Sequence, residues 1–237
     1  MRLTTTSCPN VGLFVDCLAT GYQRDLIEGV SRAASQRGAN LWVFIGGWFT
    51  DESLSHEDNV VYQLARRPAI DGLVVASSTL LNRLGAAASE RILRGLGLPL
   101  VSLGLVSEGI PSLGVDNKSA LVRLCEHLVG EHGYRKFAII GGPEHNPESQ
   151  ERIAACRETL ARLGVTVTDE QITCQGFLLR SGMDGVRELF DTRKLQREAV
   201  DAIICASDLI AEGAVRALSE RGIRVPEHVA VSGFDDL

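Results

Sequence analysis

The residues best suited to hold a small polar molecule follow short apolar segments of this sequence, at the points where strands are expected to end. In the first half of the chain they are Asp16, Tyr22, Trp48 and Ser77, and in the second half Arg152, Asp208 and Asp235. Carboxylates, one guanidinium, hydroxyls and aromatic rings can combine bidentate hydrogen bonds with stacking. We therefore predict a binding site for a neutral polyol or sugar.

The three acidic candidates of the second half also have structural interpretations. Asp208 follows Ser207 at an expected helix start, where a carboxylate can cap the helix or interact with its dipole. Asp235 and Asp236 follow an expected strand, and aspartate suits a turn at such a position. The sequence alone leaves both interpretations open.

The aromatic and cationic candidates have alternatives as well. Trp48 and Tyr22 suit packing between two lobes, or a half-buried position that keeps the polar tip in water. Arg152 suits a surface ion pair with Glu148, which lies one helical turn earlier. These alternatives make no use of a ligand.

Sequence patterns of catalysis and cofactor binding do not point to an enzyme. Gly141-Gly142 is followed by Pro143 and lacks the glycine spacing of a dinucleotide-binding turn. The chain has neither the GxxxxGK[ST] phosphate loop nor the GxSxG nucleophile motif. His145 is the only histidine that we place near the ligand site. We therefore expect no cofactor, no metal ion and no catalytic activity.

Short apolar segments alternate with longer segments of helical periodicity along the whole chain. Continuous apolar strands indicate a parallel sheet that is covered on both faces, and the alternation predicts a doubly wound α/β architecture. The expected strands are 11–16, 41–45, 72–76, 100–103, 137–140, 202–205 and 229–232. The expected helices include 23–37, 117–132, 150–163 and 209–221.

The alternation breaks once, between residues 109 and 117. There the strand at 100–103 is followed by a loop and a short strand at 113–115, without a helix between them. We therefore predict an N-terminal lobe over residues 1–115 and a C-terminal lobe over residues 116–237. Because the connection is not rich in Pro or Ser, we expect a structured hinge and not a flexible tether.

The composition limits the cellular role. The 237 residues carry a net charge of −6, which argues against direct contact with nucleic acid. None of the six cysteines forms a CxxC pair, so we expect free thiols in a reducing compartment. Neither a hydrophobic leader nor an apolar segment of membrane-spanning length is present. These features predict a cytoplasmic protein that makes no contact with a membrane.

Several motifs resemble those of one family. They include Val115-Asp116-Asn117, Ile140-Gly141-Gly142 with Arg152, Ala206-Ser207-Asp208, and the segment 222–236 that ends in Gly233-Phe234-Asp235-Asp236. The chain from about Val11 to its end resembles the effector-binding domain of LacI/GalR-type transcriptional regulators. The resemblance implies two Rossmann-like lobes with parallel sheets, the type I periplasmic-binding-protein-like fold. It also implies a small polar ligand, a sugar above all, in a cleft between the lobes, and a homodimer.

The resemblance assigns roles to individual residues. By position, Arg152 and Asp235 match the arginine and aspartate that hold sugar hydroxyls in the family. Asp208 matches the second residue of an Asn-Asp pair, but Ser207 stands here in place of the asparagine, which leaves the identity of the ligand open. The other candidates match in location only: Asp16, Tyr22, Trp48 and Ser77.

Two departures from the family pattern shape the functional hypothesis. The helix-turn-helix that precedes the first strand in such regulators is not in this sequence, and the C-terminal lobe is expected to be truncated at its end. DNA would then be bound only through a domain that this chain does not contain. The leading hypothesis is a ligand-sensing domain of a LacI-type regulator or signalling protein. The alternatives are solute binding for uptake, an α/β enzyme acting on a sugar or nucleotide, and an interaction module with a vestigial cleft.

Overall fold

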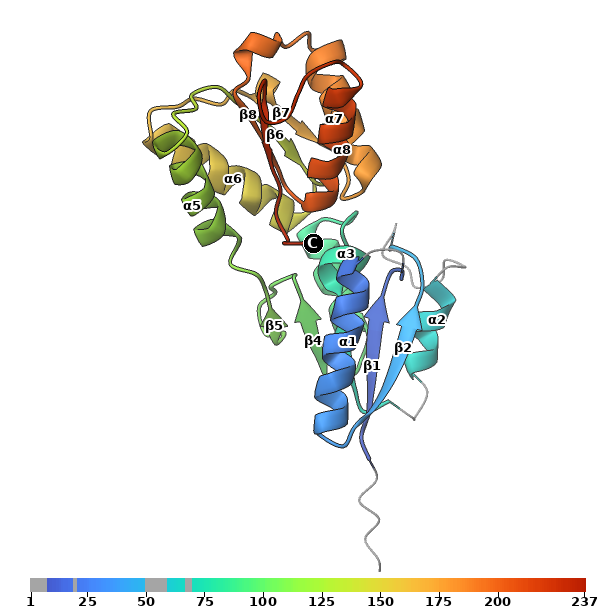
Figure 1. The fold of residues 1–237 in the computed structure, drawn as a ribbon. Coiled ribbons are helices and arrows are strands. Elements are labelled where there is room, and N and C mark those ends of the chain that lie inside the picture. Colours follow the sequence, from blue (N-terminus) through green and yellow to red (C-terminus); the bar gives the residue numbers. More distant parts are fainter. Residues whose placement is uncertain (1–7, 19–20, 50–58, 67–69) are drawn as a thin grey trace, which may run out of the picture. The chain divides into compact units, whose positions relative to one another are not determined.

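The computed structural model describes residues 8–18, 21–49, 59–66 and 70–237, and Figure 1 shows its fold. The chain divides into two compact units, Met1–Val115 and Asp116–Leu237. They are called the N-terminal lobe and the C-terminal lobe below. Each lobe is built around its own parallel sheet.

The N-terminal lobe contains a five-stranded parallel sheet in the order β2-β1-β3-β4-β5. The strands are β1 (Asn10–Val15), β2 (Asn40–Ile45), β3 (Gly72–Val75), β4 (Leu100–Leu103) and β5 (Ser112–Leu113). The helices are α1 (Gly21–Gln36), α2 (Val60–Gln63), α3 (Ser77–Leu80) and α4 (Ala86–Gly95), and a 3-10 turn, η2, covers Leu64–Arg66. Parallel pairing places the carboxyl ends of all these strands at one edge of the sheet.

The C-terminal lobe contains a four-stranded parallel sheet in the order β7-β6-β8-β9. The strands are β6 (Phe137–Gly141), β7 (Ile172–Cys174), β8 (Ala202–Cys205) and β9 (Ala230–Ser232). The principal helices are α5 (Asn117–Gly130), α6 (Pro147–Arg162), α7 (Leu179–Val186) and α8 (Asp208–Ser219). Short helical turns cover Asp169–Gln171 (η3), Arg187–Thr192 (η4) and Arg197–Ala199 (η5).

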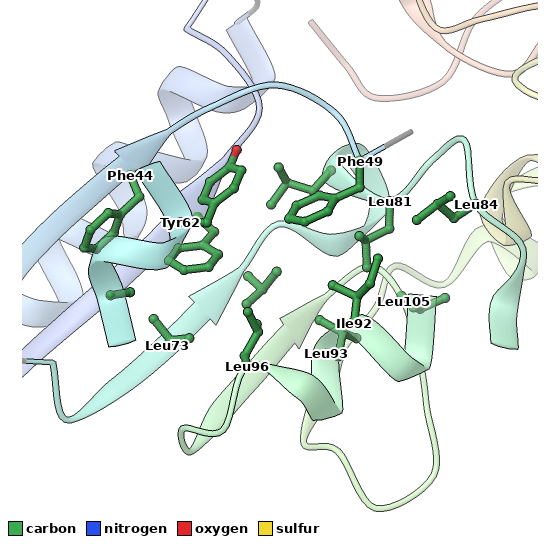
Figure 2. Close-up of a cluster of buried hydrophobic side chains, with 14 of the residues drawn as sticks. Phe44, Phe49, Tyr62, Leu73, Leu81, Leu84, Ile92, Leu93, Leu96 and Leu105 are labelled. Carbon is green, nitrogen blue, oxygen red and sulfur yellow. The ribbon is translucent and has the colours of Figure 1, made fainter. Parts of the chain in front are cut away.

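Alternate side chains of β1 bury the two faces of the N-terminal sheet. Leu13 and Val15 pack with apolar residues of α1, whereas Phe14 packs with Phe44 on the opposite face. That second face is the larger cluster, and Figure 2 shows its aromatic centre. There the buried Tyr62 hydroxyl donates to the carbonyl of Val15 (2.8 Å) and accepts from the amide of Gly46 (3.0 Å). The polar group is satisfied inside an otherwise apolar core.

The C-terminal sheet is covered in the same way. Phe137 and Ile139 face α5 and α6, while Ala138 and Ile140 face α7 and α8. In Figure 1, α5 lies beside α6 and α7 lies beside α8. Strands that are buried on both faces explain why the sequence of β6 is continuously apolar and does not alternate.

The predicted α/β class with parallel sheets is confirmed, and so are the seven main strands within one or two residues. The short strand predicted at 113–115 is shifted and observed at Ser112–Leu113. Its pairing with β4 ends where the carbonyl of Leu113 accepts from the amide of Gly104 (2.8 Å). Asp116 then caps α5 by accepting from the amide of Ser119 (3.0 Å), so residues 114–116 form the link and not a strand.

Several elements were not predicted, and β7 and α7 were missed for different physical reasons. The strand β7 contains three residues, which is too few to show a period. Helix α7 contains Gly182 and Gly185, which disfavour a helix locally. A methyl group at Gly182 would come within 2.0 Å of the carbonyl oxygen of Ile210, so these glycines permit close packing of α7 on α8. Tertiary contact therefore outweighs local propensity here.

Candidate functional site

Arg152 is the most enclosed charged residue of the C-terminal lobe. It lies on the second turn of α6, which begins with Asn146 accepting from the amide of Ser149 (2.8 Å). Only 6% of Arg152 is exposed. Its Nε donates to Asn117 Oδ1 (2.8 Å) and its Nη1 donates to the carbonyl of Ala206 (2.6 Å). These bonds fix the guanidinium at the carboxyl ends of β6 and β8.

The loop after β9 brings an aromatic ring and a carboxylate to the same guanidinium. The Cζ atom of Arg152 lies 4.0 Å from the ring centre of Phe234, in cation–π geometry. Its Nη1 lies 3.6 Å from Asp235 Oδ1. Two of the three predicted ligand-binding residues of this lobe, Arg152 and Asp235, are therefore in contact. The interpretation of Arg152 as the surface partner of Glu148 is wrong, because Arg152 is buried and its ion-pair partner is Asp235.

Asp235 has an unfavourable backbone conformation and a shifted pKa. Its φ of 117° lies in the region that favours glycine, as does the φ of 61° at Asp236. Desolvation raises the pKa of Asp235, Arg152 opposes the shift and the carboxylates of Asp208 and Glu148 add to it, so that the pKa is about 6. Both residues are thus turn residues, as one interpretation predicted. A partly exposed carboxylate with a strained backbone beside a fixed cation is also the kind of outlier that marks a functional site.

Asp208 occupies the first position of α8, and the cap itself is Ser207. The Ser207 hydroxyl accepts from the amide of Ile210 (3.3 Å), so the capping role falls to the serine. The carboxylate of Asp208 accepts from the amide of Leu237 (2.8 Å). It lies so close to the β9 loop that a methyl group at Gly233 would come within 2.0 Å of Asp208 Oδ1. The Gly-Phe-Asp sequence therefore packs directly on the start of α8.

The set of acidic groups near Arg152 includes Glu148, which the sequence analysis treated only as a surface partner. Burial raises the pKa of Glu148 and so does the charge of Glu151, while Arg152 lowers it. Glu151 itself accepts from Asn117 Nδ2 (2.7 Å). The site of the C-terminal lobe thus contains a single guanidinium among several carboxylates.

In the N-terminal lobe, Asp16 and Trp48 come together at the carboxyl ends of β1 and β2. Asp16 is 8% exposed. Its Oδ1 accepts from Gln23 Nε2 (3.0 Å) and its Oδ2 accepts from Trp48 Nε1 (2.9 Å). The Cζ atom of Arg83 lies 4.3 Å from the centre of the Trp48 ring. The carboxylate orients the indole, and the arginine covers one of its faces.

Ser77 and Tyr22 are placed differently from these two residues. Ser77 is 1% exposed, and its hydroxyl donates to the carbonyl of Leu103 (2.7 Å) and accepts from the amide of Leu105 (3.1 Å). It also lies 2.7 Å from the hydroxyl of Ser102. Tyr22 is 38% exposed on the first turn of α1. Ser77 therefore holds the segment after β4, while Tyr22 presents an accessible ring.

Within each lobe the structure brings together most of the predicted residues and adds some that were missed. Arg152, Asp208 and Asp235 share one site, and Asp16 shares another with Trp48. The missed participants are Asn117, Glu148, Phe234, Gln23 and Arg83. For three of them a signal was present: Asn117 and Phe234 lie in the quoted motifs, and Glu148 lies one turn before Arg152. For Gln23 and Arg83 the sequence contains no comparable signal.

Three further observations concern metal ligands, membrane-spanning helices and cysteines. In the described part of the chain, no group of three or more His, Cys, Asp or Glu side chains is arranged to hold a metal ion. The helices of the described residues are all too short or too polar to cross a bilayer. All six cysteines are free.

Each lobe has a parallel sheet with helices on both faces and polar residues at the carboxyl edge of the sheet. Two lobes of this kind are typical of periplasmic-binding-protein-like domains. A family model described as a periplasmic binding protein-like domain matches residues 125–237. Among solved structures, the complex of the transcriptional regulator CelR with cellobiose is 28% identical with a TM-score of 0.78, over 96% of this chain and 67% of that chain. The repressor AscG of Escherichia coli is 25% identical with a TM-score of 0.69, over 97% of this chain and 79% of that chain.

Curated relatives define the family more closely. The HTH-type transcriptional regulator CelR of Thermobifida fusca is 30% identical over 222 residues, which are 92% of this chain and 61% of CelR. The HTH-type transcriptional repressor CytR of Escherichia coli K12 is 26% identical over 90% of this chain and 59% of CytR. The similarity to LacI-family regulators that the motifs predicted is therefore confirmed over more than nine tenths of this chain. The chain spans about three fifths of these relatives, which are regulators and not enzymes.

Proposed function

We propose that this chain senses an uncharged sugar through the site around Arg152 and through the Asp16–Trp48 pair. The main support for this proposal is the fixed guanidinium of Arg152. It donates hydrogen bonds to Asn117 and to the carbonyl of Ala206, and it also contacts Phe234 and Asp235. Preorganised donors and acceptors of this kind bind vicinal hydroxyls without a large ordering cost. The similarity to CelR, whose solved structure contains cellobiose, supports a saccharide as ligand.

The ligand contacts are proposed residue by residue. Arg152 and Asp235 hold sugar hydroxyls, and Asp208 supports the loop of Asp235 and accepts from a hydroxyl. In the N-terminal lobe, Trp48 offers a stacking face that Asp16 orients. Tyr22 adds a second accessible ring, and Ser77 positions residues 102–105.

The experiment is a thermal-shift screen with cellobiose, monosaccharides, sugar phosphates and nucleosides, followed by calorimetric titration of each hit. A saturable hit should be lost in Arg152→Ala and in Asp235→Ala. The matched control is Arg162→Ala, which removes an exposed arginine of the same helix that pairs with Glu126. Absence of any hit would contradict sensing, and chemical conversion of the hit compound would favour the enzyme alternative.

We further propose a homodimer within a longer regulator whose DNA-binding part lies outside this chain. The net charge of −6 supports a separate DNA-binding part. The edge strand β2 supports the dimer, because Trp42, Val43 and Ile45 are exposed there although they are apolar. Light scattering should give twice the chain mass for the wild-type protein and a monomer for Trp42→Ser. A wild-type monomer at all concentrations would contradict the dimer.

A further inference from the structure

His127 and His132 bring two imidazole nitrogens together at the C-terminal end of α5. Their Nε2 atoms lie 3.1 Å apart, their ring centres are 4.7 Å apart and their planes are nearly perpendicular, at 86°. Both residues are exposed. Neither belongs to the proposed sugar site, because Asn117 contacts Arg152 and His127 lies ten residues further along α5, about 15 Å at the rise of an α-helix.

A local turn builds this pair. After α5, the amide of Glu131 donates to the carbonyl of His127 (2.8 Å) and the amide of Tyr134 donates to that of Leu128 (3.1 Å). Gly133 permits the turn with a φ of 69°. The turn returns His132 to the side of His127. Tyr134 then stacks on the His132 ring, with centres 5.4 Å apart and planes at 14°, and fixes its orientation.

The two rings form a hydrogen bond whose donor depends on the tautomer, and this bond is bent and not straight. In a straight N–H···N bond of this length the ring centres would be about 5.4 Å apart, since each nitrogen lies about 1.15 Å from its ring centre. The observed 4.7 Å means that at least one ring is tilted away from the line between the nitrogens. Two imidazole nitrogens that hold one tetrahedral metal ion at about 2.0–2.1 Å lie about 3.3–3.4 Å apart, so the observed separation of 3.1 Å is close to that of two ligands of a shared ion.

We propose that His127 and His132 bind one divalent first-row transition-metal ion, with solvent in its remaining positions. Imidazole is a preferred ligand of zinc, nickel and copper ions, and neutral rings are needed for binding. The carboxylate of Glu126, which is adjacent to His127, accepts a hydrogen bond from Arg162 (2.9 Å) and is therefore not counted among the metal ligands. A site with two protein ligands binds metal more weakly than a closed structural site and exchanges it faster. It responds to metal supply and leaves folding independent of metal.

Calorimetric titration of the full chain, free of tags and kept reduced, tests this proposal with Ni²⁺. Nickel is the chosen probe because the exposed thiol of Cys8 would compete for zinc. The wild-type chain should bind one equivalent at pH 7.5, and His127→Gln and His132→Gln should each weaken binding by more than about tenfold. His145→Gln, a control at another exposed histidine, should bind as the wild type does.

A readout apart from affinity separates ligation from a structural role. Without metal, all variants should melt at the wild-type temperature, because the two rings are exposed. With Ni²⁺, only the wild type and His145→Gln should gain stability. Equal titration heats for the wild type and the His127→Gln/His132→Gln double variant, including no heat from either, would overturn the proposal.

Discussion

Arg152 lies between Phe234 and Asp235, with its Cζ 4.0 Å from the centre of the Phe234 ring and its Nη1 3.6 Å from Asp235 Oδ1. Two consecutive residues of one loop thus contact the same guanidinium. In this position Asp235 has a φ of 117°, a backbone conformation that is unfavourable for a residue other than glycine. A loop that served only to leave β9 would not need this conformation, so the contact with Arg152 explains why an aspartate is held there.

The first prediction concerns the pH dependence of stability. Burial, aided by Asp208 and Glu148 and opposed by Arg152, raises the pKa of Asp235 to about 6, above its ordinary value of 3.8. The folded state therefore favours the protonated carboxyl. The resulting stabilisation is fully present below about pH 4 and is lost as the pH rises through about 6. Between these limits the wild type should lose about 1–2 kcal/mol relative to Asp235→Asn, since solvent screening of the partly exposed carboxyl reduces the effect of the shift.

Urea unfolding of both chains between pH 4 and pH 7 measures this difference, because other titrating groups cancel in the comparison. Asp169→Asn is the control for removing one negative charge, since 88% of its side chain is exposed. Parallel stability curves for the wild type and Asp235→Asn would show that Asp235 titrates normally.

The second prediction concerns ligand charge. Glu148, Asp208 and Asp235 place negative charge around the single Arg152, so the wild type should bind a neutral sugar more tightly than its phosphate ester. Glu148→Gln removes one of these charges and should improve the affinity for the phosphate by about three- to tenfold relative to the neutral sugar. Calorimetry with the sugar found in the screen and its phosphate gives the ratio. Glu158→Gln, on the exposed face of α6, should leave it unchanged; an equal ratio in Glu148→Gln would refute the charge argument.

The sequence predicted those parts of the fold that depend on local pattern. The apolar strand Phe137–Gly141 is buried on both faces, and such a strand is visible as an uninterrupted apolar segment. Helix α7 was missed because its glycines disfavour a helix until α8 packs against them. Helices α2 and α3 contain four residues each and are stabilised by their place in the core around Tyr62 and Leu80, which no periodicity reveals.

The candidate site residues also differ in how far the sequence could predict them. Arg152 and Asp235 were named as candidates because the family motifs contain them, and the contact between them is consistent with the parallel sheet. The role of Ser77 could not be predicted, because its partners Ser102 and Leu105 come from another strand and its loop. The arginine that covers Trp48 comes from residue 83, after α3, and was also beyond local reasoning. Pairwise contacts between distant segments are the information that a single sequence lacks.

The third prediction separates a structural from a ligand-binding role for Ser77. Its hydroxyl donates to the carbonyl of Leu103 and accepts from the buried amide of Leu105. Ser77→Ala leaves that amide without its acceptor and should lower the free energy of unfolding by about 1–3 kcal/mol. Sugar affinity at a temperature where the variant is folded should change less than about twofold. Ser35→Ala, on the exposed face of α1, is the control for stability. A large loss of affinity with unchanged stability would make Ser77 a direct ligand contact.

The last prediction concerns the packing of α7 on α8. A methyl group at Gly213 would come within 1.9 Å of the carbonyl oxygen of Leu179, and one at Gly182 within 2.0 Å of that of Ile210. Backbone atoms cannot rotate away as a side chain does, so either alanine must force the helices apart. Gly213→Ala and Gly182→Ala should each lower the free energy of unfolding by about 2–3 kcal/mol.

Gly29→Ala is the matched control, because Gly29 lies within α1 and has no atom within 4 Å of the added methyl position. There alanine should stabilise the protein by about 0.5–1 kcal/mol through helix propensity alone. Urea unfolding at pH 7 measures all three variants. Because Asp208 begins α8, separation of the helices by Gly213→Ala should also weaken sugar binding, whereas Gly29→Ala should not. Equal stability of Gly213→Ala and Gly29→Ala would show that α7 and α8 can separate without cost.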